Sequence, residues 1–598
     1  MTIGLFFLLL AGGDPQADTT AVPPRRDVIV VTGTYEPVSL EEMDRSVNTV
    51  DVQSLRLLSG SVADFLQLDP SLDLRERAPD GVQADLSIRG STFGQTLILL
   101  DGLRLNDAQT GHHNLDIPVP LNSLSRVEVL HGSGSALYGS DAVGGVVNFI
   151  TRSPQKAEFR LRSAAGNFGV NREAGELSVR QRGVSQLFAF SRDFSSGFIT
   201  NRDYRNLSIT SSTHLNSLWG PVHILLAHTD RPFGAQGFYG DFNSWERTRT
   251  WFVALHQSLG AKTELSLAFR RHTDHFVLYR DQPEKFQNRH VTEGWQASLR
   301  RRDPVSRNSV LHYGMEGYRD SIDSTNLGTH ARNRGAAYLS YDVRALRRFS
   351  FTLGGRQEVY NSTRGQFSPT VAAGVWLSPH LKLRASVSRA FRLPTYTDLY
   401  YHDPANQGSP DLRPEKAWDY EGGFSWNAGR RVRGDVTAFE RKDTDGIDYV
   451  RRSVSDIWRA TNIHRLRFTG VESAVTGEIR RSQRVEFRYT ALRGSGDALA
   501  GIMSRYVFNY PSHSAVASWV GWFGGEVAAR VRLGALQRLG RDPYALVDVS
   551  VARTNGRFKP FVQFANLTGT SYQEIPGVPM PGRTFVGGVE VVVYGPHK

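Results

Sequence analysis

The chain has 598 residues, of which 40% are hydrophobic and 22% are charged, and it contains 57 glycines and no cysteine. This balance excludes an intrinsically disordered chain, and the missing cysteines exclude disulfides and thiolate metal sites. The formal net charge is +12, but the basic residues are scattered and no nucleic-acid-binding motif accompanies them, so we expect no nucleic-acid partner.

The N-terminus reads MTIGLFFLLLAGGDPQA, an apolar run followed by small residues. The run is shorter than the roughly 20 residues that a membrane-spanning helix needs, and it is typical of a secretory signal. No Lys or Arg precedes it, which departs from the usual signal pattern. We predict an exported protein with a signal peptide at residues 1–21, cleaved at a point between Ala11 and Ala21.

A short run of β-branched residues follows in DVIVVTGTYEP, residues 27–37. It predicts a strand, yet Pro-containing sequence flanks it on both sides and no hairpin partner is evident. We expect an exposed, extended segment that can add as a strand to the sheet of another protein. The alternative is that it forms the first strand of the domain that follows.

Residues 38–152 mix helix and strand signals. SVADFLQLDP, residues 61–70, predicts a short amphipathic helix that stops at a proline. LSIRG, TLILLDGLRLND and SRVEVL predict strands, and Asp101-Gly102 predicts a tight hairpin. HGSGSALYGSDAVGG lacks a Gly-Lys-Ser/Thr sequence, so we expect its glycines to form tight turns rather than a phosphate-binding loop. Together these signals predict a small α+β domain.

From residue 153 onward the sequence alternates apolar and polar residues. In LKLRASVSRAF, Leu383 and Val387 fall on one face and Arg384 and Ser388 on the other, which is the strand pattern. A soluble sandwich gives the same local pattern, but its dry core could not hold so many unpaired Arg and Glu. We therefore predict an all-β transmembrane barrel of about 22 antiparallel strands around a wet lumen, with the α+β domain as a plug inside it.

Two plug blocks and three barrel blocks then carry a resemblance: LSIRGSTFGQTLILLDGLRLND, SRVEVLHGSGSALYGSDAVGGVVNFIT, SRAFRLPTYTDLYYHDPANQGSPDLRPEKAWDYEGG, RFTGVES and NLTGTSYQEIPGVPMPGRTF. In this order they closely resemble the TonB-dependent outer-membrane transporters. The resemblance implies a TonB box and linker at 27–37, a plug at 38–152 and a barrel at 153–598. It places the TonB box, which contacts the inner-membrane protein TonB, at Asp27, Val28, Ile29, Val30, Val31 and Thr32.

The family holds its plug with two arginines that face barrel glutamates. Arg89 of IRG matches the first arginine, and Glu421 of YEGG and Glu472 of GVE match its partners. The second arginine follows VEVL in the family, and here that position is His131. The resemblance implies a plug–barrel lock of these four residues, which His131 makes pH-sensitive. The alternative is that His131 hydrogen-bonds within the plug.

The resemblance also places the outward-facing binding surface on three plug loops, at about residues 77–84, 91–95 and 106–118. The candidate ligand contacts there are polar: Arg77, Asp80, Gln83, Asn106, Gln109, His112, His113 and Asn114. The two histidines indicate either contacts to a metal-containing cargo or a solvated pair. On the barrel the candidate is His402, between FRLP and LRPE, where haem-receptor relatives carry a histidine associated with haem.

The version YGSDAVGGVVN looks most like the plug block of cobalamin receptors, so a cobalamin-like cargo is favoured. Ferric siderophores and haem are the alternatives. We expect no resident cofactor and no metal site of the protein's own, although the cargo contains cobalt or iron. DTDGID, residues 443–448, resembles part of a calcium loop but lacks the closing glutamate, so we expect a turn without calcium.

The resemblance implies that TonB supplies the energy for transport, because a barrel has no nucleotide site and the outer membrane maintains no ion gradient. The expected partners are TonB, outer-membrane lipids and a corrinoid or metal-chelate substrate, and the expected location is the bacterial outer membrane. An outer-membrane enzyme would need a nucleophile–base or carboxylate cluster, which the sequence does not show, so we expect no enzyme. A plug also excludes a passive porin.

Overall fold

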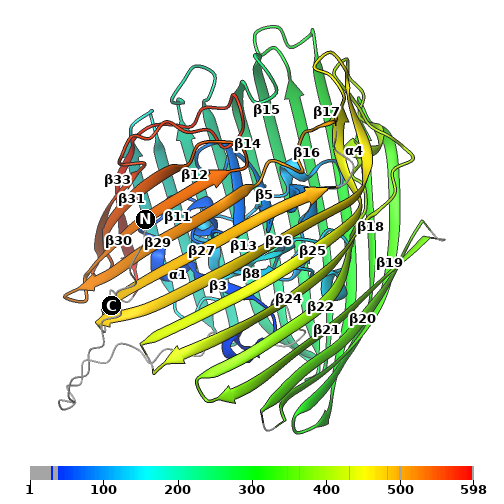
Figure 1. Cartoon of the computed structure of the whole chain (residues 1–598). Coiled ribbons are helices and arrows are strands. Elements are labelled where there is room, and N and C mark those ends of the chain that lie inside the picture. The colour runs from blue at the N-terminus through cyan, green and yellow to red at the C-terminus, as the bar shows by residue number, and fades with distance from the viewer. Residues whose placement is uncertain are drawn as a thin grey trace, which may run out of the picture.

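The computed structural model describes residues 29–30, 32 and 38–595, apart from 347, 362–363, 430, 481 and 497–500. The predicted signal peptide, residues 1–21, lies outside the described residues, as do Asp27, Val28 and Val31 of the predicted TonB box. The described chain forms a closed barrel with a smaller mixed domain inside its lumen (Figure 1).

The barrel is a closed sheet of 22 long antiparallel strands. The first eleven are β10 (Glu158–Gly166), β11 (Asn171–Gln181), β12 (Val184–Ser195), β13 (Tyr204–Ser217), β14 (Gly220–Gln236), β15 (Asn243–Leu259), β16 (Thr263–Val277), β17 (Gln287–Ser306), β18 (Ser309–Ser324), β19 (Gly328–Leu346) and β20 (Phe349–Tyr360). The other eleven are β21 (Arg364–Ser378), β22 (Leu381–Arg392), β24 (Glu415–Ala428), β25 (Val432–Arg451), β26 (Trp458–Arg480), β27 (Gln483–Gly496), β29 (Pro511–Phe523), β30 (Val527–Arg538), β31 (Tyr544–Arg553), β32 (Phe558–Ala565) and β33 (Thr584–Tyr594). β33 pairs with β10 and closes the sheet, so the predicted barrel is confirmed.

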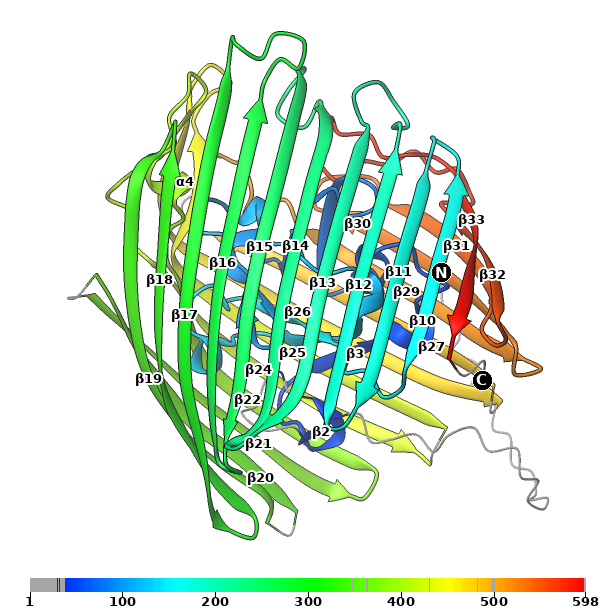
Figure 2. The same ribbon diagram turned by 180° about the vertical axis from the view of Figure 1, so that it is seen from behind.

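The two rims of the barrel differ in their connections. At one rim the turns are short, as between β11 and β12, where residues 182–183 intervene. At the other rim the loops are longer, and the loop 393–414 carries α4 (Tyr396–Tyr400) and β23 (Asn406–Gln407), near the top of both views (Figures 1 and 2). A further short strand, β28 (Met503–Ser504), lies in the loop before β29. Outer-membrane barrels place short turns in the periplasm and long loops outside, so the α4 rim faces outward.

The barrel wall is apolar outside and polar inside. On β22, Leu383 and Val387 are each 38% exposed, whereas Arg384 and Ser388 are buried toward the lumen. Because neighbouring side chains on a strand point to opposite faces, one alternating sequence supplies both surfaces. The predicted alternation is confirmed, with its apolar face outward, where a membrane barrel meets lipid.

The plug is built around a five-stranded mixed sheet in the order β3-β8-β9-β6-β7. These strands are β3 (Val47–Asp51), β8 (Leu124–His131), β9 (Gly145–Thr151), β6 (Thr96–Leu100) and β7 (Leu103–Arg104). Separate pairs join β4 (Leu72–Ala78) to β5 (Gln83–Ile88) and β1 (Ile29–Val30) to β2 (Val38–Ser39). The helices are α1 (Val52–Leu55), α2 (Ala63–Leu66) and α3 (Ser135–Tyr138), with single 3-10 turns η1 (Leu40–Glu42), η2 (Phe93–Gln95), η3 (Gly111–His113) and η4 (Leu121–Ser123).

Local signals predicted some of the elements of the plug. The predicted helix at 61–70 is present as the shorter α2, and the hairpin at Asp101-Gly102 joins β6 to β7, with φ angles of 50° and 79°. The elements α1, α3, β3, β4 and β9 were not predicted. In the described part of the chain, no helix combines the length and the apolarity needed to cross a membrane.

The predicted turn at DTDGID is wrong. These residues lie inside β25, which pairs with β26 on both sides of them, through Thr444 with Arg465 and Gly446 with Ile463. Asp445 between them has a φ of 60° and no partner in the ladder, and the register is the same on both sides of it. The Asp-Gly sequence thus interrupts the ladder of a long strand at one residue instead of ending the strand.

The glycine-rich segment makes the predicted tight turns against the wall. Gly139 ends α3 with a φ of 78°, and a Cβ placed there would lie 2.3 Å from Glu358 Oε2 and 3.0 Å from Arg356 Nε. Glycine is therefore required both by the backbone conformation and by the closeness of β20.

We expect Gly139→Ala to weaken the docked plug by about 1–2 kcal/mol, because alanine is strained at this φ and displaces Glu358. The chain has no cysteine, so the urea midpoint can be read from the labelling of one cysteine introduced at Ala63, which is buried in the plug. Gly317→Ala is the matched control, because no atom lies within 4 Å of a Cβ at that position. Equal midpoints for the two variants would contradict this explanation.

Candidate functional site

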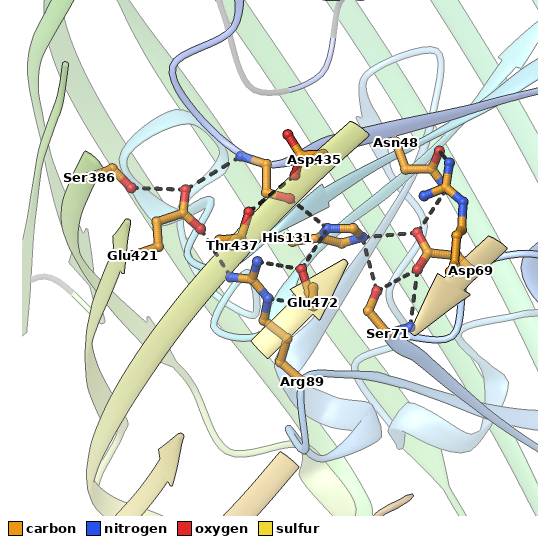
Figure 3. Close-up of polar contacts among 12 residues, drawn as sticks. Asn48, Asp69, Ser71, Arg89, His131, Ser386, Glu421, Asp435, Thr437 and Glu472 are labelled. Carbon is orange, nitrogen blue, oxygen red and sulfur yellow. Dashed lines mark hydrogen bonds and ion pairs between the residues drawn. The ribbon is translucent and has the colours of Figure 1, made fainter. Parts of the chain in front are cut away.

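Four residues meet where the plug touches β24 and β26 (Figure 3). Arg89 Nε and Nη2 donate to the two Glu472 carboxylate oxygens at 2.7 Å, and Arg89 Nη1 donates to Glu421 Oε2 at 3.0 Å. His131 Nδ1 lies 3.4 Å from Glu472 Oε2. The structure thus brings together the four residues of the predicted lock. Their role in holding the plug stays a prediction.

The position of Arg89 is fixed by the backbone as well as by charge. Arg89 follows β5 with a φ of 53°, in a turn that Gly90 continues with a φ of 70°. Arg441 of the barrel donates to the carbonyl oxygens of both residues at 3.3 Å. Burial by itself lowers the pKa of Arg89, but the carboxylate of Glu472 and its neighbours raise it above the usual range. The guanidinium is therefore charged where it meets the wall.

His131 ends β8 and is enclosed by polar groups (Figure 3). Nδ1 lies 3.0 Å from Ser46 Oγ, and Nε2 lies 3.0 Å from both Asp69 Oδ2 and Ser71 Oγ. Burial by itself lowers the pKa of His131, but the charges of Glu472 and Asp69 raise it to about 9. The protonated ring therefore donates from both nitrogens. It carries the positive charge of the arginine that the resemblance led us to expect.

Other plug–barrel ion pairs escaped the sequence analysis. Each joins a plug carboxylate to a lumen-facing cation: Asp44 to Lys382 at 2.7 Å, Asp73 to Arg538 at 2.7 Å, Asp107 to Arg270 at 2.6 Å and Asp116 to Arg231 at 3.4 Å. The alternating pattern of the strands identifies such cations as lumen-facing. It does not indicate which plug residue lies opposite, because that depends on how the two domains dock.

A cavity of about 1000 Å³ lies beside the Arg89 cluster, toward the periplasmic rim. Trp426 and Arg433 line it near the short turns, and His131 and Glu472 line its inner part. The cavity connects the periplasmic rim with the charged contacts of the plug.

The predicted TonB box is partly described, and its described end is held by the plug. Ile29–Val30 pairs with Val38–Ser39. The Thr32 backbone nitrogen donates to Glu128 Oε2 at 2.7 Å, and Thr32 Oγ1 accepts from Asn148 Nδ2 at 2.9 Å. We expected an exposed segment, whereas Thr32 is fully buried, because polar groups of β8 and β9 satisfy its backbone and hydroxyl. Its role as a TonB box stays a prediction.

The predicted cargo contacts on the plug lie toward the outward rim, and several brace the loops themselves. Asn106 Oδ1 accepts from the Ile98 backbone nitrogen at 2.7 Å, and Asn114 Oδ1 accepts from that of Asp107 at 3.0 Å. Both asparagines are buried. They fix the course of the loop rather than present a free amide to a cargo.

Three further candidates are engaged in polar contacts. Arg77 Nη1 lies 3.1 Å from Asp85 Oδ2. Asp80 accepts from Tyr204 Oη of the wall at 2.6 Å, and Gln83 Nε2 donates to Tyr239 Oη at 3.0 Å. Asp80 and Gln83 thus tie plug loops to the barrel.

His112 stands in an aromatic group at the outward end of the plug. Its ring stacks on Phe93 at 4.3 Å, and Tyr506 meets Phe93 edge-on at 5.1 Å. His112 Nδ1 lies 2.6 Å from Asp85 Oδ1. Burial, the largest influence, lowers the pKa of His112, so the ring is neutral at pH 7. Plug and extracellular loop therefore share one aromatic surface.

His113 turns to the barrel wall instead. Nε2 lies 3.4 Å from Asp274 Oδ2 on β16 and 3.9 Å from Glu246 Oε1 on β15, and Gln109 Nε2 donates to Asp274 Oδ2 at 2.9 Å. Burial by itself lowers the pKa of His113, but Asp274 and the other carboxylates raise it to about 10.

Wall residues opposite His113 were missed by the sequence analysis, although RRHTDHF in β16 carried a signal. Arg270, His272 and Asp274 alternate there and all face the lumen, where they are buried. Alternating charged residues and histidine on an outward-rim strand would have identified them as a group.

His402 lies on the extracellular loop 393–414 and is exposed. Its backbone nitrogen donates to Asn326 Oδ1 at 3.4 Å, and its carbonyl oxygen accepts from Asn326 Nδ2 at 2.9 Å. These contacts fix the backbone and leave the role of the imidazole as a prediction.

Comparison with known proteins agrees with this architecture. Residues 151–574 match the family described as TonB dependent receptor-like, beta-barrel, and residues 39–146 match the TonB-dependent Receptor Plug Domain. The chain is 22% identical to the vitamin B12 transporter BtuB of Photobacterium profundum over 75% of each chain. It is 25% identical to the iron-regulated outer membrane virulence protein of Vibrio cholerae, over 87% of this chain and 85% of that protein.

Solved structures share the fold. A mutant of the ferric enterobactin receptor of Pseudomonas aeruginosa, in complex with enterobactin, superposes with a TM-score of 0.77 at 14% identity, over 92% of this chain and all of that chain (100%). The siderophore receptor PirA of Acinetobacter baumannii gives a TM-score of 0.75 at 15% identity, over 91% of this chain and 98% of that chain. At these identities the likeness concerns the fold alone.

We expect the docked plug to lose stability as the pH rises from 6.5 to about 9. The folded pKa of His131, about 9, lies above the ordinary value of 6.5. Its contribution is therefore complete below pH 6.5 and is lost as the pH rises through about 9, by up to about 3 kcal/mol. The urea midpoint for labelling a cysteine at Ala63 measures this change.

His131→Arg keeps the positive charge at every pH in this range, so its urea midpoint should fall less steeply than that of the unchanged protein. The fall that remains comes from His113, whose pKa is also raised, to about 10. His131→Asn removes the charge and should give a low midpoint throughout. The same pH dependence in all three proteins would assign the titration to another group.

Proposed function

Because the chain belongs to the TonB-dependent receptor family, we propose that it takes up a scarce, large, metal-containing nutrient across the outer membrane with energy delivered by TonB. Members of this family are outer-membrane transporters, and no catalytic function is indicated. The observation that carries the proposal is the buried contact of Arg89 with Glu421 and Glu472. A lumen closed by such ion pairs opens only when work is done on the plug.

Residues 27–32 are the proposed handle for that work. An extended segment that adds to the sheet of a partner gains main-chain hydrogen bonds along its length and transmits tension. The contacts of Thr32 with Glu128 and Asn148 join this segment to β8 and β9 of the plug sheet. A pull on the segment therefore acts first on the plug. If residues 27–32 formed only the first strand of the plug, changing this segment would have no effect on transport.

A cobalamin-like nutrient is the first candidate cargo. The plug block YGSDAVGGVVN looks most like that of cobalamin receptors. Among the relatives, a protein named as a vitamin B12 transporter aligns over 75% of the chain. Both observations support a corrinoid substrate.

Ferric siderophores are the second candidate, and the outward aromatic surface favours them. Phe93, His112 and Tyr506 form that surface, and Arg505 stands over the rings of Tyr506 at 5.5 Å and Trp458 at 5.7 Å. Exposed guanidinium and aromatic groups attract anionic chelates with aromatic rings. Haem, which the position of His402 suggested, is the third.

Deleting residues 27–32 should abolish uptake and leave binding to the cell surface intact. The cargo binds at the outward side of the barrel, whereas this segment is proposed to contact TonB at the periplasmic side. Val28→Pro should act in the same way, since proline cannot donate to a ladder, whereas Val28→Ala should transport normally. Uptake of the nutrient into cells and binding of the nutrient to the cell surface are measured separately. Unchanged uptake after the deletion would refute energised transport through this segment.

Cyanocobalamin, a ferric catecholate siderophore and haem, offered separately to the purified protein, should give one tight binder. For an aromatic chelate, Tyr506→Ala should weaken binding by about tenfold, because one stacking or cation–π contact is worth roughly 1–1.5 kcal/mol. Trp219→Ala, at the periplasmic turn between β13 and β14, is the control. Equal weakening by both variants would remove Tyr506 from the cargo surface.

A further inference from the structure

Five buried ligand-type side chains lie together where plug loop 106–118 meets β15 and β16. We call them the bridging cluster: His113 and Asp116 of the plug, and Glu246, His272 and Asp274 of the wall. Their exposed fractions run from 0% to 6%. In two overlapping sets, one with His113, Asp116 and His272 and one with His113, Glu246 and Asp274, the ligand atoms lie within 4.8 Å of one another.

Distances within the bridging cluster are close to those around a metal ion. Two ligand atoms on one tetrahedral zinc lie about 3.4 Å apart, given metal–ligand bonds near 2.0–2.1 Å. His113 Nε2 lies 3.4 Å from Asp274 Oδ2, and His272 Nε2 lies 3.2 Å from Asp116 Oδ2. The rings of the two histidines are 4.8 Å apart between centroids.

Carboxylates outnumber guanidinium groups around the bridging cluster. Four carboxylates gather there, those of Asp116, Glu246 and Asp274 and that of Asp107, which lies 2.9 Å from His272 Nδ1. Two guanidinium groups face them, Arg270 against Asp107 and Arg231 against Asp116. A divalent ion at the bridging cluster would meet this excess of carboxylates with positive charge.

Two oxygen atoms at the bridging cluster favour the ion. Asp274 Oδ1 and Gln109 Oε1 are buried and have no hydrogen-bond partner among the described residues. Both side chains are 5% exposed. A buried acceptor without a donor costs about 1–3 kcal/mol, whereas a cation uses such oxygen atoms as ligands.

One partly exposed side chain of an extracellular loop contacts the bridging cluster. Tyr239 lies in the loop between β14 and β15, is 37% exposed, and its Oη donates to Glu246 Oε2 at 2.7 Å. Gly237 and Gly240 lie on either side of it with φ angles of 74° and 124°. The bridging cluster therefore lies next to the outward-facing loops of the barrel.

We propose that the bridging cluster binds one divalent first-row transition-metal ion between the plug and the barrel wall. His113 is common to both sets, and either set combines imidazole with carboxylate and no thiolate, which suits Zn²⁺ and its neighbours. No metal site was expected from the sequence, in which the wall ligands lie far along the chain from the plug histidines. This site differs from a binding site for a bulky chelate, because its ligands are buried and have room only for an ion without a chelator.

The test uses the full-length protein purified in detergent and made metal-free. After equilibration with ZnCl₂, mass spectrometry of the metal should find one zinc per chain. Titration should show that the variants His113→Gln and Asp274→Asn bind zinc at least ~10-fold more weakly than the unchanged protein. Co²⁺ in the same site should give visible absorption bands typical of coordination by fewer than six ligands, and both variants should lose them.

His223→Gln is the matched control, because His223 belongs to a separate histidine stack with His214 on the same wall. It should bind zinc like the unchanged protein. Unaltered binding in both His113→Gln and Asp274→Asn, or equal loss in His223→Gln, would overturn the assignment. Asp274→Asn nearly preserves shape and serves if His113→Gln fails to fold. No transport is measured, so the outcome is independent of the proposed uptake.

Discussion

A charge buried inside the barrel must meet an opposite charge there, and this constraint determines how the plug sits. Arg89 is nearly inaccessible to solvent, yet Glu421 and Glu472 satisfy all three of its nitrogens. Removing one partner of such a contact leaves an uncompensated charge, which costs about 3–5 kcal/mol. A small displacement of the plug would therefore break several contacts at once, which is the physical basis for the predicted role of these residues in holding the plug.

His131 shows how the same constraint tolerates a change of residue. An arginine in this position would carry a permanent charge, whereas the imidazole acquires one because Asp69 and Glu472 lie on either side of it. The wall and the plug together thus set the charge of a residue that is neutral in many other settings. The substitution keeps the electrostatic contact and adds a dependence on protons.

Local patterns predicted the architecture, and long-range contacts limited the prediction of the site. Alternation over a few residues, as in LKLRASVSRAF, is enough to assign a strand and its two faces, because side-chain direction on a strand depends on neighbours alone. The family resemblance identified Arg89, Glu421 and Glu472 as site residues, because each lies in a short motif of neighbouring residues. The approach of His113 to Asp274 joins positions 161 residues apart in the chain. No local signal encodes that docking. The predicted turn at residues 443–448 failed for the opposite reason, because pairing with β26 continues the strand through a local Asp-Gly turn signal.

The polar inner wall has a consequence for the empty barrel. Ser386 and Ser388 of β22, Thr210 and Ser212 of β13 and Thr250 of β15 all face inward and are covered by other groups in the closed state. Three of these hydroxyls, on Thr210, Thr250 and Ser388, have no hydrogen-bond partner among the described residues, so water wets them without displacing a protein contact. The inner wall is not polar throughout, because Leu225 of β14 and Phe252 of β15 pack into the apolar core of the plug. Uncovering such apolar surface costs about 25 cal/mol per Å². An emptied lumen would therefore be wetted readily along β13 and β22, and the plug would be hardest to separate from β14 and β15.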